Sequence, residues 1–361
     1  MRTLWPQLST WLDSGEPFAL ATVIAVSGSV SRAPGSCMAI MPERNRFLGS
    51  VSSGCLDTEV VHAADAALTT GESQRLRFGP DGSPPWIAGL TCGGWVDVLV
   101  DPWWGSHPRE RVRPVASRVR SWLEDDRPGV VLTRDGSHLA IDDDDEPAGD
   151  IEAFSREWID RARAQLAAGM PPALCGTAQG SVFIRTVRRR PRLFLLDAVD
   201  IAARLVAFGR EAGFSTFVVD PRSAHGVAER FSVAPDHLVR SWPQKVIAGA
   251  DLGPRDAAIV LTHDPKIDDA ALLALLKTAV GYLGALGSKR SHAERLERLE
   301  EAGADRATLD RIQGPAGIHL GTPDAAGIAA GIFAGLLQWQ AGAERTRLQS
   351  VVGVGTGIGA L

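Results

Sequence analysis

Short apolar runs separated by glycines and prolines characterise the first part of the chain. Four of these runs are rich in β-branched or other apolar side chains and are typical of strands. They cover residues 21–26, 36–41, 47–51 and 96–100. Residues 56–70 instead carry apolar side chains at helical spacing, directly after Ser52-Ser53-Gly54-Cys55. The pattern therefore predicts strands around one helix that begins at Cys55.

A hairpin is predicted in the middle of the chain. Residues 130–133 and 138–141 are apolar and flank Asp135-Gly136, a dipeptide that favours a tight turn. The acidic run that follows, residues 142–146, is predicted to be a solvated loop. Residues 188–192 are charged and contain a proline, so we place a domain boundary there.

After this boundary, apolar strands alternate with helices. Residues 193–196, 201–212 and 216–219 are predicted to form a βαβ unit. Further apolar runs, predicted as strands, are 245–247, 257–262 and 280–286, and they alternate with helical stretches at 268–278 and 291–301. Such alternation is typical of a parallel sheet covered by helices.

These patterns predict an α/β protein of two domains. Residues 1–190 are expected to form a mixed α+β domain and residues 191–345 a Rossmann-like domain with a parallel sheet. Residues 346–361 are rich in glycine and are expected to be a flexible tail.

Composition excludes one class of partner. The chain has 361 residues, of which 45% are hydrophobic and 22% charged, as is ordinary for two globular domains. Because 38 Lys+Arg face 43 Asp+Glu, the net charge of -5 provides no basic field for a phosphate backbone. We therefore exclude nucleic acid as a partner.

The apolar stretches favour a cytoplasmic protein without stable membrane insertion. The start of the chain lacks the apolar core of a secretory signal, and the most apolar stretch, residues 325–337, is too short to cross a bilayer. Gly327, Gly331 and Gly335 lie four apart there, which suits either a core helix or a homodimer interface.

Two glycine-flanked turns each contain a cysteine. Ser53-Gly54-Cys55 and Cys92-Gly93-Gly94 have small side chains, so that a thiol and backbone amides can approach a ligand closely. Such turns suit a soft metal or a sulfur donor, with Cys55 and Cys92 as the metal ligands. Alternatively, both thiols are small buried side chains. Cys37 and Cys175 lie elsewhere, and no pair has the close spacing of a zinc or thioredoxin-type site.

The first βα turn of the second domain departs from a dinucleotide site. A pyrophosphate needs glycines there, whereas this chain has Asp197-Ala198-Val199-Asp200. Asp197 would repel a pyrophosphate, so NAD(P) binding is disfavoured, and Asp200 is expected to cap the helix. Asp220 ends the next strand, where an NAD enzyme holds its ribose.

Two later turns can bind a ligand. Gly287-Ser288-Lys289-Arg290 lies between a strand and a helix, so that amides, a hydroxyl and two cations suit a phosphate. His263 and Asp264 end another strand at the edge where open α/β sheets bind ligands. His263 could contact a ligand, or it could be structural.

With these segments in view, the chain resembles the XdhC/CoxI family of molybdenum-hydroxylase accessory proteins. The matching segments are 28–35, 49–55, 90–94, 261–264 and 286–290. The family usually has Gly-Ala-Gly-His at the turn that here begins at Asp197, and a glycine at the position of Ser53. The resemblance implies an N-terminal cofactor-handling domain and a Rossmann-like C-terminal domain.

The resemblance also implies a function. Members bind molybdenum cofactor, assist its sulfuration with a cysteine desulfurase, and deliver it to apo xanthine dehydrogenase or a related enzyme. Both cysteine turns are then expected to contact the cofactor, and the protein would act as a carrier rather than by turnover. Two rival hypotheses are a nicotinamide-dependent oxidoreductase, favoured by the βαβ unit, and an interaction scaffold without ligand.

Overall fold

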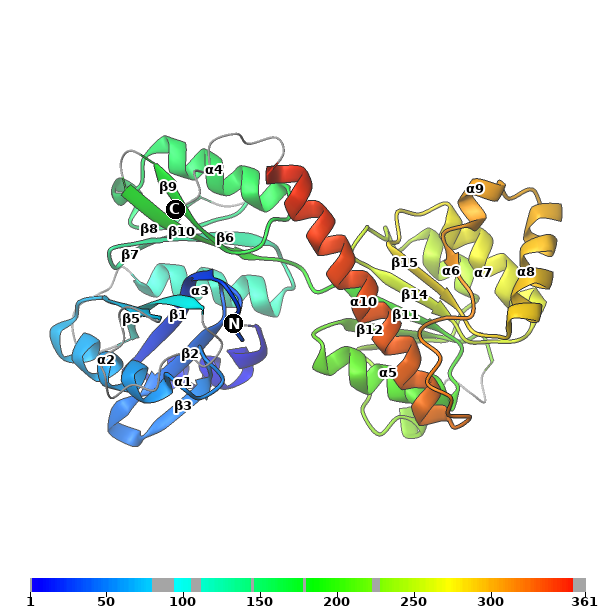
Figure 1. The fold of residues 1–361 in the computed structure, drawn as a ribbon, viewed down its shortest axis with the longest axis horizontal. Helices are drawn as coiled ribbons and strands as arrows, with labels where there is room; N and C mark the ends of the chain where they lie inside the picture. The colour runs from blue at the N-terminus through cyan, green and yellow to red at the C-terminus, as the bar shows by residue number, and fades with distance from the viewer. Residues whose placement is uncertain are drawn as a thin grey trace. The chain divides into compact units, whose positions relative to one another are not determined.

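The computed structural model describes residues 2–79, 94–104, 112–143, 146–177, 180–222 and 228–352 (Figure 1). The chain divides into two compact units, Met1–Arg189 and Arg190–Leu361. The first contains two antiparallel sheets, and the second contains one parallel sheet.

The first sheet of unit 1 has five antiparallel strands. In spatial order they are β3 (Arg46–Gly49), β2 (Cys37–Met41), β1 (Phe18–Ser27), β5 (Trp95–Trp104) and β4 (Gln74–Phe78). Side chains alternate along β1, so that Ala19, Ala21 and Val23 share a core with helix α2 (Asp57–Thr70). Phe18 and Leu20 face the opposite core, which contains helices α1 (Trp5–Ser14) and α3 (Val112–Glu124).

The second sheet of unit 1 lies on the other side of α3. Its strands are β8 (Ala148–Gly149), β7 (Ser137–Ile141), β6 (Gly129–Arg134), β10 (Gly180–Val187) and β9 (Ala173–Thr177). Helix α4 (Arg156–Ala167) covers its outer face. Short 3-10 helices are Arg2–Leu4, Pro42–Arg44 and Ile151–Ala153. The predicted hairpin is confirmed as β6 and β7, whose turn places Asp135 at φ 48° and Gly136 at φ 76°.

Unit 2 is a six-stranded parallel sheet with the strand order of a Rossmann fold. The order is β13 (His237–Val239), β12 (Ser215–Val219), β11 (Arg192–Leu196), β14 (Ala257–Val260), β15 (Tyr282–Ala285) and β16 (Ile312–Gln313). The direction of the winding reverses between β11 and β14, which is where such sheets bind ligands. The predicted mixed α+β first part and the parallel-sheet second part are both confirmed.

Helices cover both faces of this sheet. On one face lie α5 (Asp200–Glu211) and α10 (Ala325–Val352), and on the other lie α6 (Pro243–Ala248), α7 (Pro265–Leu276), α8 (Lys289–Glu301) and α9 (Arg306–Leu309). A 3-10 turn covers Ala228–Arg230. Side chains of β11 alternate between the two cores, which explains why this strand is apolar throughout.

The glycine stripe of α10 packs within unit 2. A Cβ atom at Gly331 would lie 2.3 Å from the carbonyl oxygen of Ile318, and one at Gly335 would lie 2.6 Å from Cα of Gly317. These glycines therefore let the preceding segment of the same chain approach the helix.

Several local predictions need correction. Residues 245–247, predicted as a strand, belong to helix α6, which begins at Pro243. Asp142, predicted to be solvated with the acidic run, is buried and accepts hydrogen bonds from Trp122 (2.6 Å) and Arg118 (3.3 Å). Residues 144–145 lie outside the described residues. Residues 346–352, expected in the tail, are helical, and 353–361 lie outside the described residues.

None of the helices that the structure describes is long and apolar enough to span a membrane.

Candidate functional site

A turn rich in serine precedes helix α2. The hydroxyl of Ser50 accepts hydrogen bonds from the backbone amides of Ser52 (3.2 Å) and Ser53 (2.8 Å). The buried hydroxyl of Ser52 accepts from the amide of Leu56 (2.9 Å) and donates to Asp57 (2.9 Å). The turn's own hydroxyls therefore bond the amides of Ser52, Ser53 and Leu56, and Asp57 lies in the first turn of α2, where the helix dipole stabilises its carboxylate.

This turn presents Cys55 to solvent. Ser53 (φ 64°) and Gly54 (φ 115°) adopt left-handed conformations, which explains why small residues occupy both positions. The thiol of Cys55 is exposed and lies 3.3 Å from the carbonyl oxygen of Ser52. The prediction that a helix begins at Cys55 is slightly early, because α2 begins at Asp57. Cys55 is therefore not a buried core side chain.

The structure connects this turn to the neighbouring predicted segments. Ser31 donates a hydrogen bond to the carbonyl oxygen of Ser52 (3.1 Å). A Cβ atom at Gly94 would lie 2.6 Å from the carbonyl oxygen of Ser29, so only glycine fits against that loop. Cys92 and Gly93 lie outside the described residues. Among the residues that are described, no cluster of three or more His, Cys, Asp or Glu side chains is placed to hold a metal.

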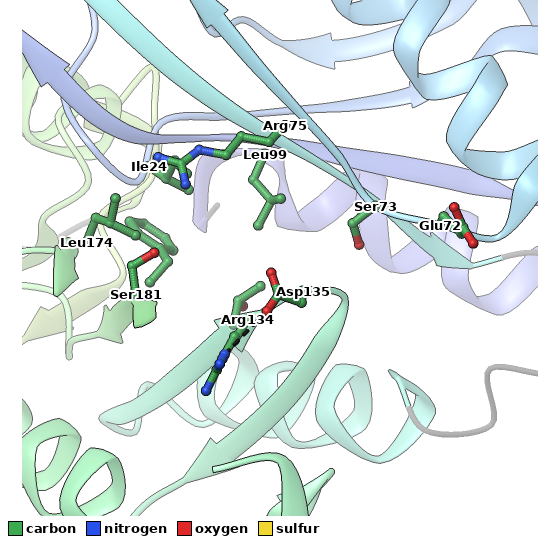
Figure 2. Close-up of a pocket in the computed structure, with 11 residues that line it drawn as sticks. Ile24, Glu72, Ser73, Arg75, Leu99, Arg134, Asp135, Leu174 and Ser181 are labelled. Carbon is green, nitrogen blue, oxygen red and sulfur yellow. Dashed lines mark hydrogen bonds and ion pairs between the residues drawn. The ribbon is translucent and has the colours of Figure 1, made fainter. Parts of the chain in front are cut away.

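Unit 1 also contains a cavity that the sequence analysis missed. It has a volume of about 420 Å³ and lies between the two sheets (Figure 2). Ile24, Leu99 and Phe183 line its apolar part, while Arg75 and Asp135 contribute charged groups. The cavity lies beyond the C-terminal end of α2, whereas Cys55 precedes its N-terminal end. Cys55 is not among the residues that line this cavity.

In unit 2 a crevice opens at the reversal of the strand order. Its volume is about 590 Å³, and it is lined by the turns that follow four parallel strands. The lining residues are Asp197, Val199, Ile201, Arg222, Leu261, Thr262, His263, Asp264, Pro265 and Leu286. The predicted ligand residues His263 and Asp264 therefore line one crevice with the turn that begins at Asp197.

An ion cluster fills the turn where a pyrophosphate would approach. The guanidinium of Arg222 forms ion pairs with Asp197 and with Asp220, the latter through Nε (3.0 Å) and Nη2 (2.8 Å). Asp220 is fully buried and also accepts a hydrogen bond from the amide of Ala198 (3.0 Å). The Ala198 amide and the Asp220 carboxylate are the groups that could contact a nucleotide here. They are instead hydrogen-bonded to each other. Sequence analysis identified both acids but missed Arg222.

Asp200 does not cap α5. Val199 occupies the N-cap position, and Asp200 is the first residue of the helix. Its carboxylate lies 3.4 Å from Arg230. The prediction of a capping role for Asp200 is therefore wrong, although its charge still lies in the favourable first turn.

Asp264, not His263, has a defined local role. The Asp264 carboxylate caps α7 by accepting a hydrogen bond from the amide of Lys266 (3.0 Å), and the Asp264 amide donates to the Thr262 hydroxyl (3.0 Å). His263 is exposed at the rim of the crevice. Its imidazole is therefore accessible to a ligand.

The turn from Gly287 to Arg290 forms a reciprocal cap. Ser288 accepts a hydrogen bond from the amide of Ser291 (3.1 Å), and Ser291 accepts from the amide of Ser288 (2.8 Å). The amides of Lys289 and Arg290 begin α8 and have no intrahelical acceptor by position. Arg290 is directed along the helix surface to Glu294 (2.9 Å) rather than toward the cap.

Matches to known proteins lie over both of these regions. The family model described as XdhC and CoxI family matches residues 11–79, which include the serine turn and Cys55. The family model described as XdhC Rossmann domain matches residues 193–336, which include the crevice. The chain belongs to the XdhC/CoxI family. This agrees with the resemblance inferred from the motifs.

Two relatives of this XdhC/CoxI protein are similar over most of their length. A Bacillus subtilis protein named as a probable xanthine dehydrogenase subunit is 26% identical over 336 residues, which are 92% of this chain and 96% of the relative. The molybdenum cofactor insertion chaperone PaoD of Escherichia coli is 25% identical over 327 residues, which are 90% of this chain and 83% of the relative.

A solved structure has the same fold. The crystal structure of a xanthine dehydrogenase from Bacillus halodurans matches with a TM-score of 0.75 at 24% identity, and the match covers 93% of this chain and 95% of that chain.

Two departures from the usual XdhC/CoxI sequence occur at left-handed backbone positions. Ser53 (φ 64°) and Asp197 (φ 110°) stand where the family usually has glycine. Both residues therefore hold a backbone conformation that favours glycine, in agreement with the glycines that the resemblance implies at these positions.

Proposed function

We propose that this protein binds molybdenum cofactor as cargo in the cytoplasm. It supports sulfuration of the cofactor together with a cysteine desulfurase, and it delivers the cofactor to an apo molybdenum hydroxylase such as xanthine dehydrogenase. The observation that carries the proposal is the exposed Cys55 thiol on a turn whose backbone is held by Ser50, Ser52 and Ser31. The similarity to a relative named as an insertion chaperone supports the same function.

The chemistry of the thiol suits a soft metal centre. A thiolate is a good ligand for a soft transition metal. It can also attack the outer sulfur of a persulfide on a cysteine desulfurase, which forms a new S–S bond, breaks the old one and releases the desulfurase thiolate. Cys55 projects from a turn that is already satisfied by its own hydroxyls, so binding a ligand would require little backbone rearrangement. We assign Cys92 as its partner, with Ser53, Gly54, Gly93 and Gly94 providing close backbone approach.

The second unit supports a role for the organic part of the cofactor. The amides of Lys289 and Arg290 and the Lys289 cation can contact a phosphate at the N-terminus of α8, and the Arg290 cation can join them once it leaves Glu294. The crevice beside this turn, with His263 and Asp264 on its rim, is large enough for a small heterocyclic ligand. The strand order also suits a nicotinamide nucleotide, but the Asp197–Arg222–Asp220 cluster opposes one.

The test compares cysteine variants of the full chain purified from a host that makes the cofactor. We expect Cys55→Ala and Cys92→Ala to lose most of the copurifying molybdenum and fluorescent pterin at an unchanged thermal midpoint. Cys175→Ala is the matched control, because Cys175 is a half-buried thiol on β9, outside these turns, and should keep the parent's content. The proposal fails if the parent carries no more molybdenum than an unrelated protein purified in parallel, or if both variants retain it.

A further inference from the structure

Two of the turns that line the crevice follow adjacent strands. Val260 of β14 and Ala285 of β15 are paired in the parallel register, so the segments Thr262–Asp264 and Leu286–Ser288 leave the sheet side by side. The first segment leads into α7 and the second into α8. A ligand that contacts both the Thr262–Asp264 turn and the Leu286–Ser288 turn can bind tightly only if the distance between the two turns is fixed before binding.

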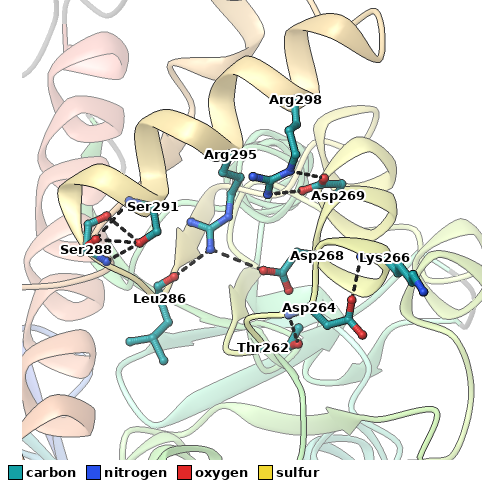
Figure 3. A network of polar contacts seen from close by, with 10 residues as sticks. All are labelled: Thr262, Asp264, Lys266, Asp268, Asp269, Leu286, Ser288, Ser291, Arg295 and Arg298. Carbon is teal, nitrogen blue, oxygen red and sulfur yellow. Dashed lines mark hydrogen bonds and ion pairs between the residues drawn. The ribbon is translucent and has the colours of Figure 1, made fainter.

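A buried ion pair lies beneath these two turns (Figure 3). Asp268 in the first turns of α7 and Arg295 in α8 are only 2% and 3% exposed, and their nearest oxygen and nitrogen are 3.5 Å apart. The same Nη2 atom of Arg295 donates a hydrogen bond to the carbonyl oxygen of Leu286 (2.9 Å). One guanidinium thus contacts both α7 and the backbone that leads into α8.

The ion pair between Asp268 and Arg295 lowers the stability of the folded state. Within the described part of the chain, Oδ1 of Asp268 and both Nε and Nη1 of Arg295 are buried without a hydrogen-bond partner. Burying charged groups that are incompletely paired costs stability, so such a pair is not needed for packing alone. Burial raises the pKa of Asp268 to about 7, against the attraction of Arg295.

A second ion pair also joins α7 and α8, and its hydrogen-bond geometry is better than that of the buried pair. Arg298, one turn after Arg295, and Asp269, the residue after Asp268, are joined by two hydrogen bonds of 2.8 and 3.0 Å and are partly exposed. Arg295 differs from Arg298 in one respect that concerns the crevice, namely its hydrogen bond to the Leu286 carbonyl oxygen. The hydrogen bond to the Leu286 backbone is therefore what distinguishes the buried pair from its neighbour.

Gly287 makes this contact possible. It has φ 147°, and a Cβ atom there would lie 2.9 Å from Oγ of Ser291 and 3.7 Å from Nη2 of Arg295. The absence of a side chain lets the turn lie directly on the cap and on the guanidinium.

We propose that Arg295, held in place by Asp268, is a positioning residue that fixes the Leu286–Ser288 turn relative to the Thr262–Asp264 turn for ligand binding. The positioning is a property of the protein without ligand. Only the role of this positioning in ligand binding rests on the proposed function, because that function defines the ligand. The pair itself does not touch the ligand, because both side chains are buried.

The first test needs no ligand. Hydrogen exchange, followed by mass spectrometry on the full chain, compares Arg295→Lys with Arg298→Lys. Lysine keeps the charge, but its side chain is one bond shorter, so its ammonium does not reach the position of Nη2 between Asp268 and the Leu286 carbonyl oxygen. We therefore expect exchange in the peptide that contains Leu286–Lys289 to rise about tenfold in Arg295→Lys and to stay unchanged in Arg298→Lys. Equal exchange in the two variants would overturn the proposal. If Arg295→Lys does not fold, Asp268→Asn keeps the side-chain shape and should raise exchange in the same peptide.

The second test asks whether the position of the turn matters for binding. Inorganic phosphate is titrated into the parent and both variants while the amide resonances of Lys289 and Arg290 are followed. Weaker binding in Arg295→Lys, but not in Arg298→Lys, supports the proposal, whereas equal binding despite faster exchange would contradict it. If the parent carries no molybdenum cofactor, the proposed function fails, but the exchange comparison still decides whether Arg295 positions the turn.

Discussion

Asp197 and Arg222 form an ion pair across the mouth of the turn that a Rossmann dinucleotide site would leave open. Asp197 holds a left-handed backbone conformation (φ 110°) in which most side chains are strained. Arg222 stabilises its carboxylate and simultaneously binds the buried Asp220. Asp197, Arg222 and Asp220 therefore form one ion cluster, which occupies the position that a pyrophosphate would take.

This relationship predicts that NAD(H) and NADP(H) do not bind at submillimolar concentration. The negative Asp197 lies where the pyrophosphate would lie, and the Ala198 amide is already bound to Asp220. Calorimetric titration of the parent measures this directly, and tight binding would revive the oxidoreductase hypothesis. We expect Asp197→Gly to lose only part of the unfolding free energy that the buried ion pair contributes, because the relieved backbone strain opposes that loss. Asp197→Asn, which keeps the strain but loses the charge, serves as the control and should be the less stable variant.

The serine turn predicts a second measurable effect. Ser52→Ala removes the acceptor of the Leu56 amide and one donor to Asp57, so we expect a loss of about 1 kcal/mol of unfolding free energy. We also expect less copurifying molybdenum, because the backbone that presents Cys55 loses a restraint. Thr70→Ala is the matched control at the opposite end of α2, where the hydroxyl bonds the Ala66 carbonyl (3.0 Å). Equal molybdenum loss in the two variants would show that helix stability, not the turn, controls retention.

The buried Asp268 predicts an unusual dependence of stability on pH. Its pKa in the folded protein is raised to about 7, above the ordinary value, mainly by burial and also by Asp269, while Arg295 and Arg298 oppose the shift. Proton uptake therefore favours the folded state. The free energy of unfolding that Asp268 contributes in this way is fully present below about pH 4, and it is lost as the pH rises through about 7.

Urea unfolding of the parent and of Asp268→Asn isolates this contribution. Asparagine does not titrate, so between about pH 5 and about pH 8 the parent should lose more than about 1.4 kcal/mol relative to the variant, the equivalent of one pKa unit. Asp269→Asn should keep most of the parent's pH dependence, because burial rather than the Asp269 charge is the main cause of the raised pKa of Asp268. Parallel curves for the parent and Asp268→Asn would mean that Asp268 titrates normally.

The hydrophobic pattern was sufficient to predict strands β11, β12, β14 and β15 of unit 2 and the hairpin of unit 1, because strands buried on both faces and a tight Asp-Gly turn have strong local signals. It missed the short edge strands β13 and β16. It failed at residues 245–247, where a short apolar run has no periodicity that separates a strand from a helix. The signal that could have decided is Pro243, which occupies the first position of α6.

The residues that line the crevice, and the buried pair beneath its turns, were only partly predictable. Motif turns such as Thr262–Asp264 are visible in the sequence, but Arg295 lies in a helix that is mostly charged and gives no sign of burial. A usable signal was its spacing, since Arg295 is four residues before the buried Leu299, and Asp268 is four residues before the buried Leu272. A charged residue on the apolar stripe of a helix marks a position where the tertiary fold provides a partner.

The last prediction concerns Lys289 and Arg290 at the start of α8. Their amides and the Lys289 cation offer contacts to a phosphate, and Arg290 can add a second cation by leaving Glu294. Exposed charge-assisted contacts of this kind weaken as salt screens them. We expect Lys289→Gln with Arg290→Gln to weaken binding of cofactor or of a free pterin phosphate, most clearly at low salt. The thermal midpoint should hardly change, because the Arg290–Glu294 pair is exposed and such pairs add little stability. Lys277→Gln with Arg306→Gln removes the same charge from exposed positions of the same unit and should bind like the parent. If the Lys289 and Arg290 variant also binds like the parent at low salt, the phosphate does not lie at α8, and the crevice beside His263 becomes the place to test next.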